Sequence, residues 1–142
     1  MAYFLSGLPN LGLIANAGAA LSPLLIAIGA VAGAWSRYGI TLYCTDRWGG
    51  RFPYGTFVVN LSGAFLIGVI VPLVQTRFPP LADLLVIGFL GAYTTFSTYM
   101  LDTINLFRAE QRRKALIYWL GSAGLGLAFA ELGLWLGNFW RP

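Results

Sequence analysis

Asn60 is a polar side chain inside an otherwise apolar stretch, the charge-free run 52–76. Its carboxamide offers two N–H donors and one carbonyl acceptor. As a structural residue it would bond a neighbouring helix, and as a functional residue it would donate to an anion. Both interpretations stay open on the sequence alone.

The run 94–98 is the second polar feature, and it reads Thr-Thr-Phe-Ser-Thr. Hydroxyl side chains offer the backbone alternative hydrogen-bond partners, so the run favours a local break in a helix. A break frees main-chain carbonyls, which are hard oxygen ligands suited to Na⁺, Mg²⁺ or Ca²⁺. The alternative is an ordinary kinked helix whose hydroxyls bond back to its own carbonyls.

Phe96 and Tyr99 are three residues apart, so they share one helical face. An aromatic ring has a positive edge, and two ring edges along one track would favour an anion without a formal charge. Plain packing is the alternative interpretation of this pair.

The composition indicates a membrane protein. Of the 142 residues, 58% are hydrophobic and only 10% are charged, against about 25% charged in soluble domains. There is no histidine and a single cysteine, Cys44, which excludes histidine-based catalysis and an intrachain disulfide. The hydroxyls and Cys44 lack an evident activating base, so we do not expect an enzyme.

Charge-free runs predict four transmembrane helices, since a helix needs about 20 apolar residues to cross the hydrocarbon core. We place them at 24–43, 55–75, 83–106 and 115–138. Ser22-Pro23 predicts the start of the first helix. Residues 1–22 are then expected to form an apolar leader, partly ordered or interfacial, before a four-helix transmembrane domain at 23–142.

Small residues spaced four apart predict close helix packing. They occur at Gly29/Gly33, Ala64/Gly68, Gly88/Ala92, Ser122/Gly126 and Gly126/Ala130. Because four helices make a small bundle, we expect at least a homodimer. The basic residues are biased towards the loops between helices one and two and between helices three and four, which the positive-inside rule places in the cytoplasm.

Taken together, these segments resemble the Fluc-type (CrcB-like) fluoride ion channels. The resemblance covers roughly residues 24–138 and rests on three stretches, Gly29–Tyr38, Gly55–Gly68 and Gly88–Tyr99. It implies an all-α integral membrane protein of the plasma membrane with a break in the third helix. It also implies an antiparallel, dual-topology homodimer that exports fluoride passively and so protects against fluoride toxicity.

The resemblance further implies roles for individual residues. The fluoride pathway would be lined by Asn60, Phe96, Tyr99, Ser97, Thr98 and Ser122. The carbonyls of Gly91 and Thr94 from both subunits would ligate one structural Na⁺, and Arg37 and Asp102 would orient the loops or line a vestibule.

Three features depart from the family's usual pattern. Tyr99 stands where phenylalanine is usual, and its hydroxyl could donate to fluoride or obstruct the path. Ala92 replaces a common glycine beside the break. The biased loop charges leave open a chain that inserts one way and pairs with an oppositely oriented partner.

A small proton-coupled multidrug-type antiporter is the alternative function. Such a transporter needs a membrane-embedded carboxylate, classically in its first helix. The first span has none, which leaves Glu131 in the fourth as the candidate.

Overall fold

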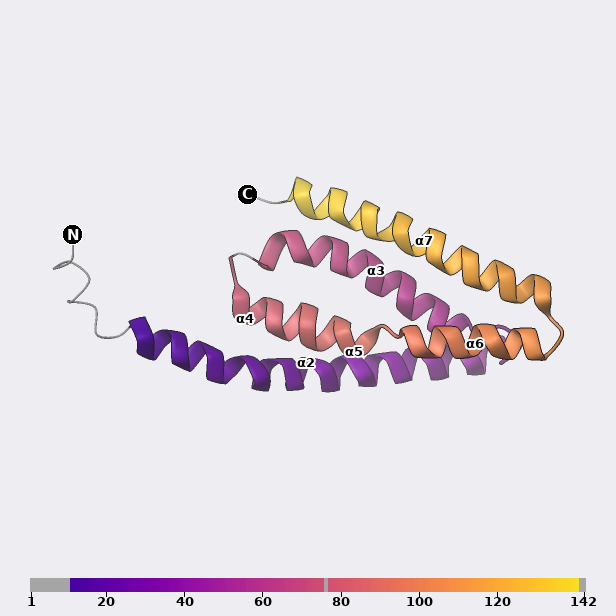
Figure 1. Ribbon diagram of the computed structural model, residues 1–142, viewed down its shortest axis with the longest axis horizontal. Helices are drawn as coiled ribbons and strands as arrows, with labels where there is room; N and C mark the ends of the chain where they lie inside the picture. The colour runs from indigo at the N-terminus through magenta and orange to yellow at the C-terminus, as the bar shows by residue number, and fades with distance from the viewer. Residues whose placement is uncertain (1–10, 76, 141–142) are drawn as a thin grey trace.

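The structure is a computed structural model that describes residues 11–75 and 77–140. Its elements run in the order α2 (Leu11–Trp48), α3 (Tyr54–Val74), α4 (Pro79–Ala82), η1 (Asp83–Leu90), α5 (Gly91–Tyr93), α6 (Phe96–Arg108) and α7 (Arg112–Phe139) (Figure 1). Four helical stretches are long and apolar enough to cross a membrane, namely Leu21–Trp48, Tyr54–Val74, Pro79–Arg108 and Arg112–Phe139. The four predicted spans are therefore confirmed, and the chain is a multi-pass membrane protein.

Helix α2 begins earlier than the sequence predicts. It starts at Leu11 and continues through Pro23, so the expected helix start at Ser22-Pro23 is wrong. The Ser22 hydroxyl donates to the carboxylate of Asp83 in η1 instead of capping a helix. Residues 1–10 of the expected leader lie outside the described residues.

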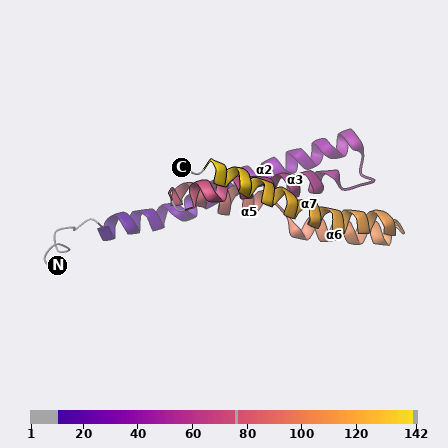
Figure 2. The ribbon, with the colours of Figure 1, turned by 90° about the horizontal axis from the view of Figure 1, so that it is seen from above.

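The length of α2 exceeds what one bilayer crossing requires. At 1.5 Å per residue its 38 residues span about 57 Å, against about 30 Å for the hydrocarbon core. Its N-terminal part consequently extends past the other helices in both ribbon views (Figures 1 and 2).

Glycines mark the two closest helix crossings. A Cβ built on Gly29 of α2 would lie 2.1 Å from the Leu84 carbonyl oxygen in η1, and one on Gly68 of α3 would lie 2.4 Å from the Ala130 carbonyl oxygen in α7. Only residues without a side chain let the backbones approach this closely. Close packing is thereby confirmed at Gly29, Gly33, Gly68 and Gly88.

The crossing of α7 inside the subunit lies beyond the predicted small residues. A Cβ on Gly126 would meet no atom within 4 Å inside the subunit, so close packing at Gly126 is not made there and stays a prediction. Gly133 and Gly137 make the crossing, with built Cβ atoms 2.3 Å from the Phe65 carbonyl oxygen and 2.6 Å from the Val69 carbonyl oxygen.

The third span is assembled from four helical pieces rather than one. Its η1 piece is π-helical, and the Gly91 N–H that follows it bonds the carbonyl of Val86, five residues earlier. π-Helical turns within α-helices are frequent at functional sites. Here the π-helical piece is followed by the short helix α5, which ends at the interruption before α6.

Two buried clusters lie on either side of that interruption. Val59, Leu90 and Tyr93 join α3 to η1 and α5. The other cluster joins α6 to α7 through Tyr99, Leu106, Ala115 and Tyr118. Hydrophobic packing therefore holds both halves of the third span in place while the chain between them stays extended.

Candidate functional site

The predicted break in the third span is present at Thr94 and Thr95. Both residues are extended, with φ −79° and ψ 158° at Thr94 and φ −151° and ψ 119° at Thr95. The alternative of a continuous kinked helix is excluded by these angles. The Thr94 hydroxyl does bond back to the Leu90 carbonyl, at 2.9 Å, so back-bonding accompanies the break.

Asn60 of α3 holds the break through two hydrogen bonds to one residue. Its Nδ2 donates to the Thr95 carbonyl at 2.9 Å, and its Oδ1 accepts from the Thr95 N–H, also at 2.9 Å. This pairing fixes which end of the carboxamide is the donor. Asn60 therefore has a structural role within the subunit, and its second Nδ2 hydrogen is not needed for it.

Gly63 brings α3 close enough for that pairing. It lies three residues after Asn60 and hence on the same helical face. A Cβ at Gly63 would lie 2.2 Å from Thr94 Cγ2. The absence of a side chain therefore gives the Thr94 methyl group the space it occupies.

The break diverts two N–H groups from their helical partners. In a continuous helix Thr95 N–H would donate to the Gly91 carbonyl, but here it donates to Asn60. Likewise Thr98 N–H would donate to the Thr94 carbonyl, but it donates to Thr95 Oγ1 at 3.2 Å and so caps α6. The carbonyls of Gly91 and Thr94 thereby lose their helical donors to Asn60 and to the Thr95 hydroxyl.

A cavity of about 390 Å³, here called the break groove, brings several predicted site residues together. All of its lining residues are uncharged, and they include Asn60, Gly91, Thr94, Thr95, Phe96 and Tyr99. Ser97, Thr98 and Ser122 do not line it. The groove thus joins the amide, the aromatic pair and the two residues whose carbonyls lack helical donors.

The aromatic pair has unequal surroundings. The rings of Phe96 and Tyr99 lie 5.9 Å apart at 55°. Phe96 is 74% exposed in the subunit, whereas Tyr99 is buried. The Tyr99 hydroxyl donates to the Trp119 carbonyl of α7 at 2.5 Å, which gives it a partner within the subunit.

The remaining predicted hydroxyls lie in two places, beside Thr95 and on α7. Ser97 Oγ lies 3.3 Å from Thr95 Oγ1, and Thr98 Oγ1 accepts from Thr95 Oγ1 at 3.0 Å. Ser122 Oγ on α7 is buried, and among the described residues it has no hydrogen-bond partner. A buried hydroxyl without a partner costs free energy of folding. The Ser122 hydroxyl is therefore available for a hydrogen bond with a further group.

Two further cavities follow the groove towards the loops. Arg37 lines a middle cavity of about 250 Å³ together with Thr56, Thr95 and Thr98. Thr95 also lines the break groove, and Thr56 and Thr98 also line the next cavity. The three cavities therefore share lining residues in sequence from the break to the loop end.

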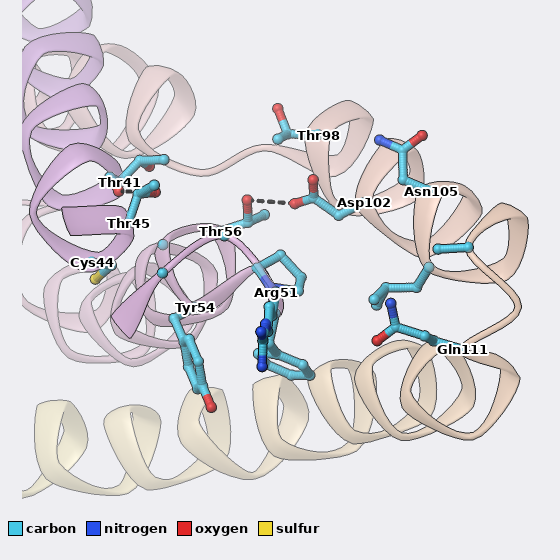
Figure 3. A pocket seen from close by; sticks show the side chains of 17 residues that line it. Thr41, Cys44, Thr45, Arg51, Tyr54, Thr56, Thr98, Asp102, Asn105 and Gln111 are labelled. Carbon is cyan, nitrogen blue, oxygen red and sulfur yellow. Dashed lines mark hydrogen bonds between the residues drawn. The ribbon is translucent and has the colours of Figure 1, made fainter. Parts of the chain in front are cut away.

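The loop-end cavity has a volume of about 420 Å³ and a mixed polar wall (Figure 3). Asp102 lies in it, where its Oδ2 accepts a 2.7 Å hydrogen bond from Thr56 Oγ1 and faces the Tyr118 hydroxyl at 3.5 Å. Arg51 contributes a positive charge to the same cavity. Asp102 of α6 thereby contacts both α3 and α7.

Sequence reasoning missed Thr56 and the double role of Thr95. Thr56 and Asn60 are four residues apart and therefore share one face of α3. This spacing could have indicated Thr56 as a site residue. The double role of Thr95 rests on main-chain geometry, which leaves no mark in the sequence.

Among the described residues, no group of three His, Cys, Asp or Glu side chains could hold a metal ion. Any cation here would therefore depend on other oxygens.

The sequence profile described as "CrcB-like protein, Camphor Resistance (CrcB)" matches residues 24–134. A protein of Synechococcus sp. (strain JA-2-3B'a(2-13)) named "Fluoride-specific ion channel FluC" is 43% identical over 122 residues, which cover 84% of this chain and 94% of the relative. Proteins of the same name from Trichormus variabilis and Synechocystis sp. are 42% and 43% identical, over 82% and 79% of this chain and 88% of each relative.

Proposed function

The chain belongs to the CrcB-like family, and from this membership we propose that it is a fluoride-selective channel. It lets cytoplasmic fluoride leave the cell passively through the plasma membrane and so protects against fluoride toxicity. It is a channel and not an enzyme.

The observation that carries this proposal is the uncharged break groove, in which Asn60 and the Phe96 ring share one cavity. Fluoride is small and strongly hydrated, so a selective pore must replace its water with donors without binding it too tightly for release. An amide N–H and a positive ring edge meet both conditions. A lysine or arginine side chain lining the groove would risk trapping the ion.

The pathway that we propose follows the shared residues of the three cavities. Fluoride passes from the loop-end cavity past Thr98 to the middle cavity, where Arg37 attracts it, and then to Asn60 and Phe96. Ser97 and the unpartnered Ser122 are further donors along this route. Tyr99 contributes its ring, since its hydroxyl is engaged with Trp119.

The functional unit in this proposal is a dual-topology homodimer. Phe96 is 74% exposed in one subunit, although a ring that selects an anion would need to be shielded from lipid. A second subunit, inserted antiparallel, would cover the break groove and complete the pathway. The biased loop charges also allow a subunit that inserts one way with an oppositely oriented partner.

Na⁺ is the proposed structural ion of that dimer. The Gly91 and Thr94 carbonyls fit this role because their helical donors are diverted, which leaves hard oxygens without an N–H at the break. Gly91 is also exposed in the subunit. Main-chain oxygens from both copies would hold the ion between the subunits.

The antiporter alternative gains no support. Glu131 is exposed on α7 and lines none of the three cavities described above. The relatives named above carry the name of a fluoride channel.

Fluoride efflux from liposomes that contain the purified protein tests the function. We expect fluoride to leave down its own gradient at the same rate with and without an imposed pH gradient. A strict requirement for the pH gradient would overturn the channel and favour an antiporter.

A further inference from the structure

The Gly91 and Thr94 carbonyls are open because two side-chain groups take the N–H groups that would otherwise cover them. Asn60 Oδ1 accepts the Thr95 N–H at 2.9 Å, and Thr95 Oγ1 accepts the Thr98 N–H at 3.2 Å. Asn60 belongs to α3, whereas Thr95 lies in the break itself. Thr95 takes part in both contacts, through its N–H in one and its hydroxyl in the other, and each contact removes the helical donor of a different carbonyl.

We propose that Asn60 and Thr95 are positioning residues of the cation site, because they hold back the N–H groups that compete with the cation for the carbonyls. The inference rests on the sodium site of the proposed function. It adds to that site two side chains that do not touch the ion and nevertheless set its affinity.

The physical basis is competition for one acceptor. A carbonyl oxygen that accepts an N–H has a partial positive charge beside it, and it is a weaker ligand for a cation than a free carbonyl. Without Asn60, the Thr95 N–H would regain the Gly91 carbonyl as its nearest helical partner. Without the Thr95 hydroxyl, the Thr98 N–H would regain the Thr94 carbonyl in the same way.

The break also has other supports, so losing either contact need not unfold the protein. Thr94 is anchored to Leu90 through both its N–H, at 3.1 Å, and its hydroxyl, at 2.9 Å. On the other side, α6 is fixed to α7 by the Tyr99–Trp119 bond. The two N–H groups can consequently change partners locally.

Asn60 further connects the two ions of the proposed function. The same carboxamide lines the groove through which the anion would pass and controls a carbonyl of the cation site. A change at Asn60 is therefore expected to alter Na⁺ affinity as well as fluoride flux, and the two effects can be measured separately.

Na⁺-dependent thermal stability of the purified full-length protein in detergent tests the proposal. NaCl replaces choline chloride at constant ionic strength, and the Na⁺ concentration for half of the stabilisation is measured. Asn60→Leu and Thr95→Val should each raise that concentration by about five- to tenfold, the factor that corresponds to regaining one intramolecular hydrogen bond. Thr95→Ser keeps the hydroxyl and should behave like the wild type.

Ser62→Ala is the matched control on α3. The Ser62 hydroxyl bonds the carbonyls of Val58 and Val59 and the hydroxyl of Tyr93, and it does not hold the Thr95 or Thr98 N–H. Its loss should leave the Na⁺ concentration for half stabilisation unchanged.

The result that would overturn the proposal is an unchanged Na⁺ dependence in both Asn60→Leu and Thr95→Val. If Asn60→Leu does not fold, Thr95→Val with its serine control decides alone. A wild type that Na⁺ does not stabilise would overturn the cation site and this inference together. Fluoride efflux by the wild type, measured in parallel, reports separately on the channel function.

Discussion

The carboxamide of Asn60 and the main chain of Thr95 are joined by two hydrogen bonds of 2.9 Å that run in opposite directions. This pair ties α3 to the one extended segment of the third span. The side chain thus supplies the hydrogen bonds that the backbone gives up where α5 ends. Non-helical backbone at membrane depth is tolerated only where such partners exist.

Gly63→Ala tests how closely α3 must approach the break. The new methyl group would lie 2.2 Å from Thr94 Cγ2, and Thr94 cannot easily yield because its hydroxyl is bonded to Leu90. We expect a loss of about 1–3 kcal/mol of unfolding free energy, typical of overpacking, together with reduced fluoride flux. Thermal denaturation and liposome efflux measure the two effects.

Gly39→Ala is the control for that substitution. A Cβ at Gly39 meets no atom within 4 Å, and alanine is favoured in a helix. This variant should be as stable as the wild type and as active. Equal behaviour of Gly63→Ala and Gly39→Ala would mean that the close approach of α3 is unimportant.

Phe96→Ile tests the ring edge in the break groove. The substitution removes the aromatic edge and keeps an apolar side chain of somewhat smaller volume, so the protein should still fold. Fluoride efflux should fall by orders of magnitude if the edge contacts the ion. Normal efflux from a variant of unchanged oligomeric state would show that the Phe96 ring only packs.

Tyr99→Phe separates the hydroxyl from the ring at the neighbouring position. It removes the hydrogen bond to the Trp119 carbonyl and should cost about 1 kcal/mol of unfolding free energy. Fluoride efflux should stay near the wild-type rate because the ring edge remains. Loss of efflux in a stable Tyr99→Phe protein would instead make the hydroxyl an essential donor.

Thr56 and Asp102 form a coupled pair in the loop-end cavity, at 2.7 Å. In a double-mutant cycle of Thr56→Val and Asp102→Ala, we expect a coupling free energy of about 1 kcal/mol or more, measured from the free energies of unfolding of the four proteins. The control cycle pairs Asp102→Ala with Thr45→Val, since Thr45 bonds only the Thr41 carbonyl among the hydrogen bonds found for it. Additive effects in both cycles would contradict the contact.

Much of the fold could be predicted because apolar length and hydroxyl chemistry are visible in a sequence. The four spans follow from charge-free runs, and the break at Thr94 and Thr95 follows from the hydroxyl run. The π-helical turn of η1 could not be predicted, since shifting a main-chain hydrogen bond by one residue leaves no side-chain pattern. The N-terminal start of α2 was missed because a membrane helix can contain a proline such as Pro23.

The sequence indicated part of the set of residues that line the break groove, and it indicated their hydrogen-bond partners less well. Asn60, Phe96 and Tyr99 do share one cavity with Gly91 and Thr94. The partner of the Tyr99 hydroxyl is a main-chain carbonyl on another helix. Every residue has such a carbonyl, so the sequence does not mark which one accepts the hydrogen bond. The small-residue spacing around Gly126 shows a smooth face and not which helix covers it, and inside the subunit no atom lies within 4 Å of a Cβ at Gly126.

The function proposed for this chain is passive conduction selective for fluoride. It is measured in liposomes that contain the purified wild-type protein and are loaded with fluoride and chloride, by following both ions with selective electrodes without a pH gradient. We expect fluoride to leave rapidly down its gradient while chloride is retained as in protein-free liposomes. Comparable release of chloride, or retention of both ions by correctly folded protein, would contradict it.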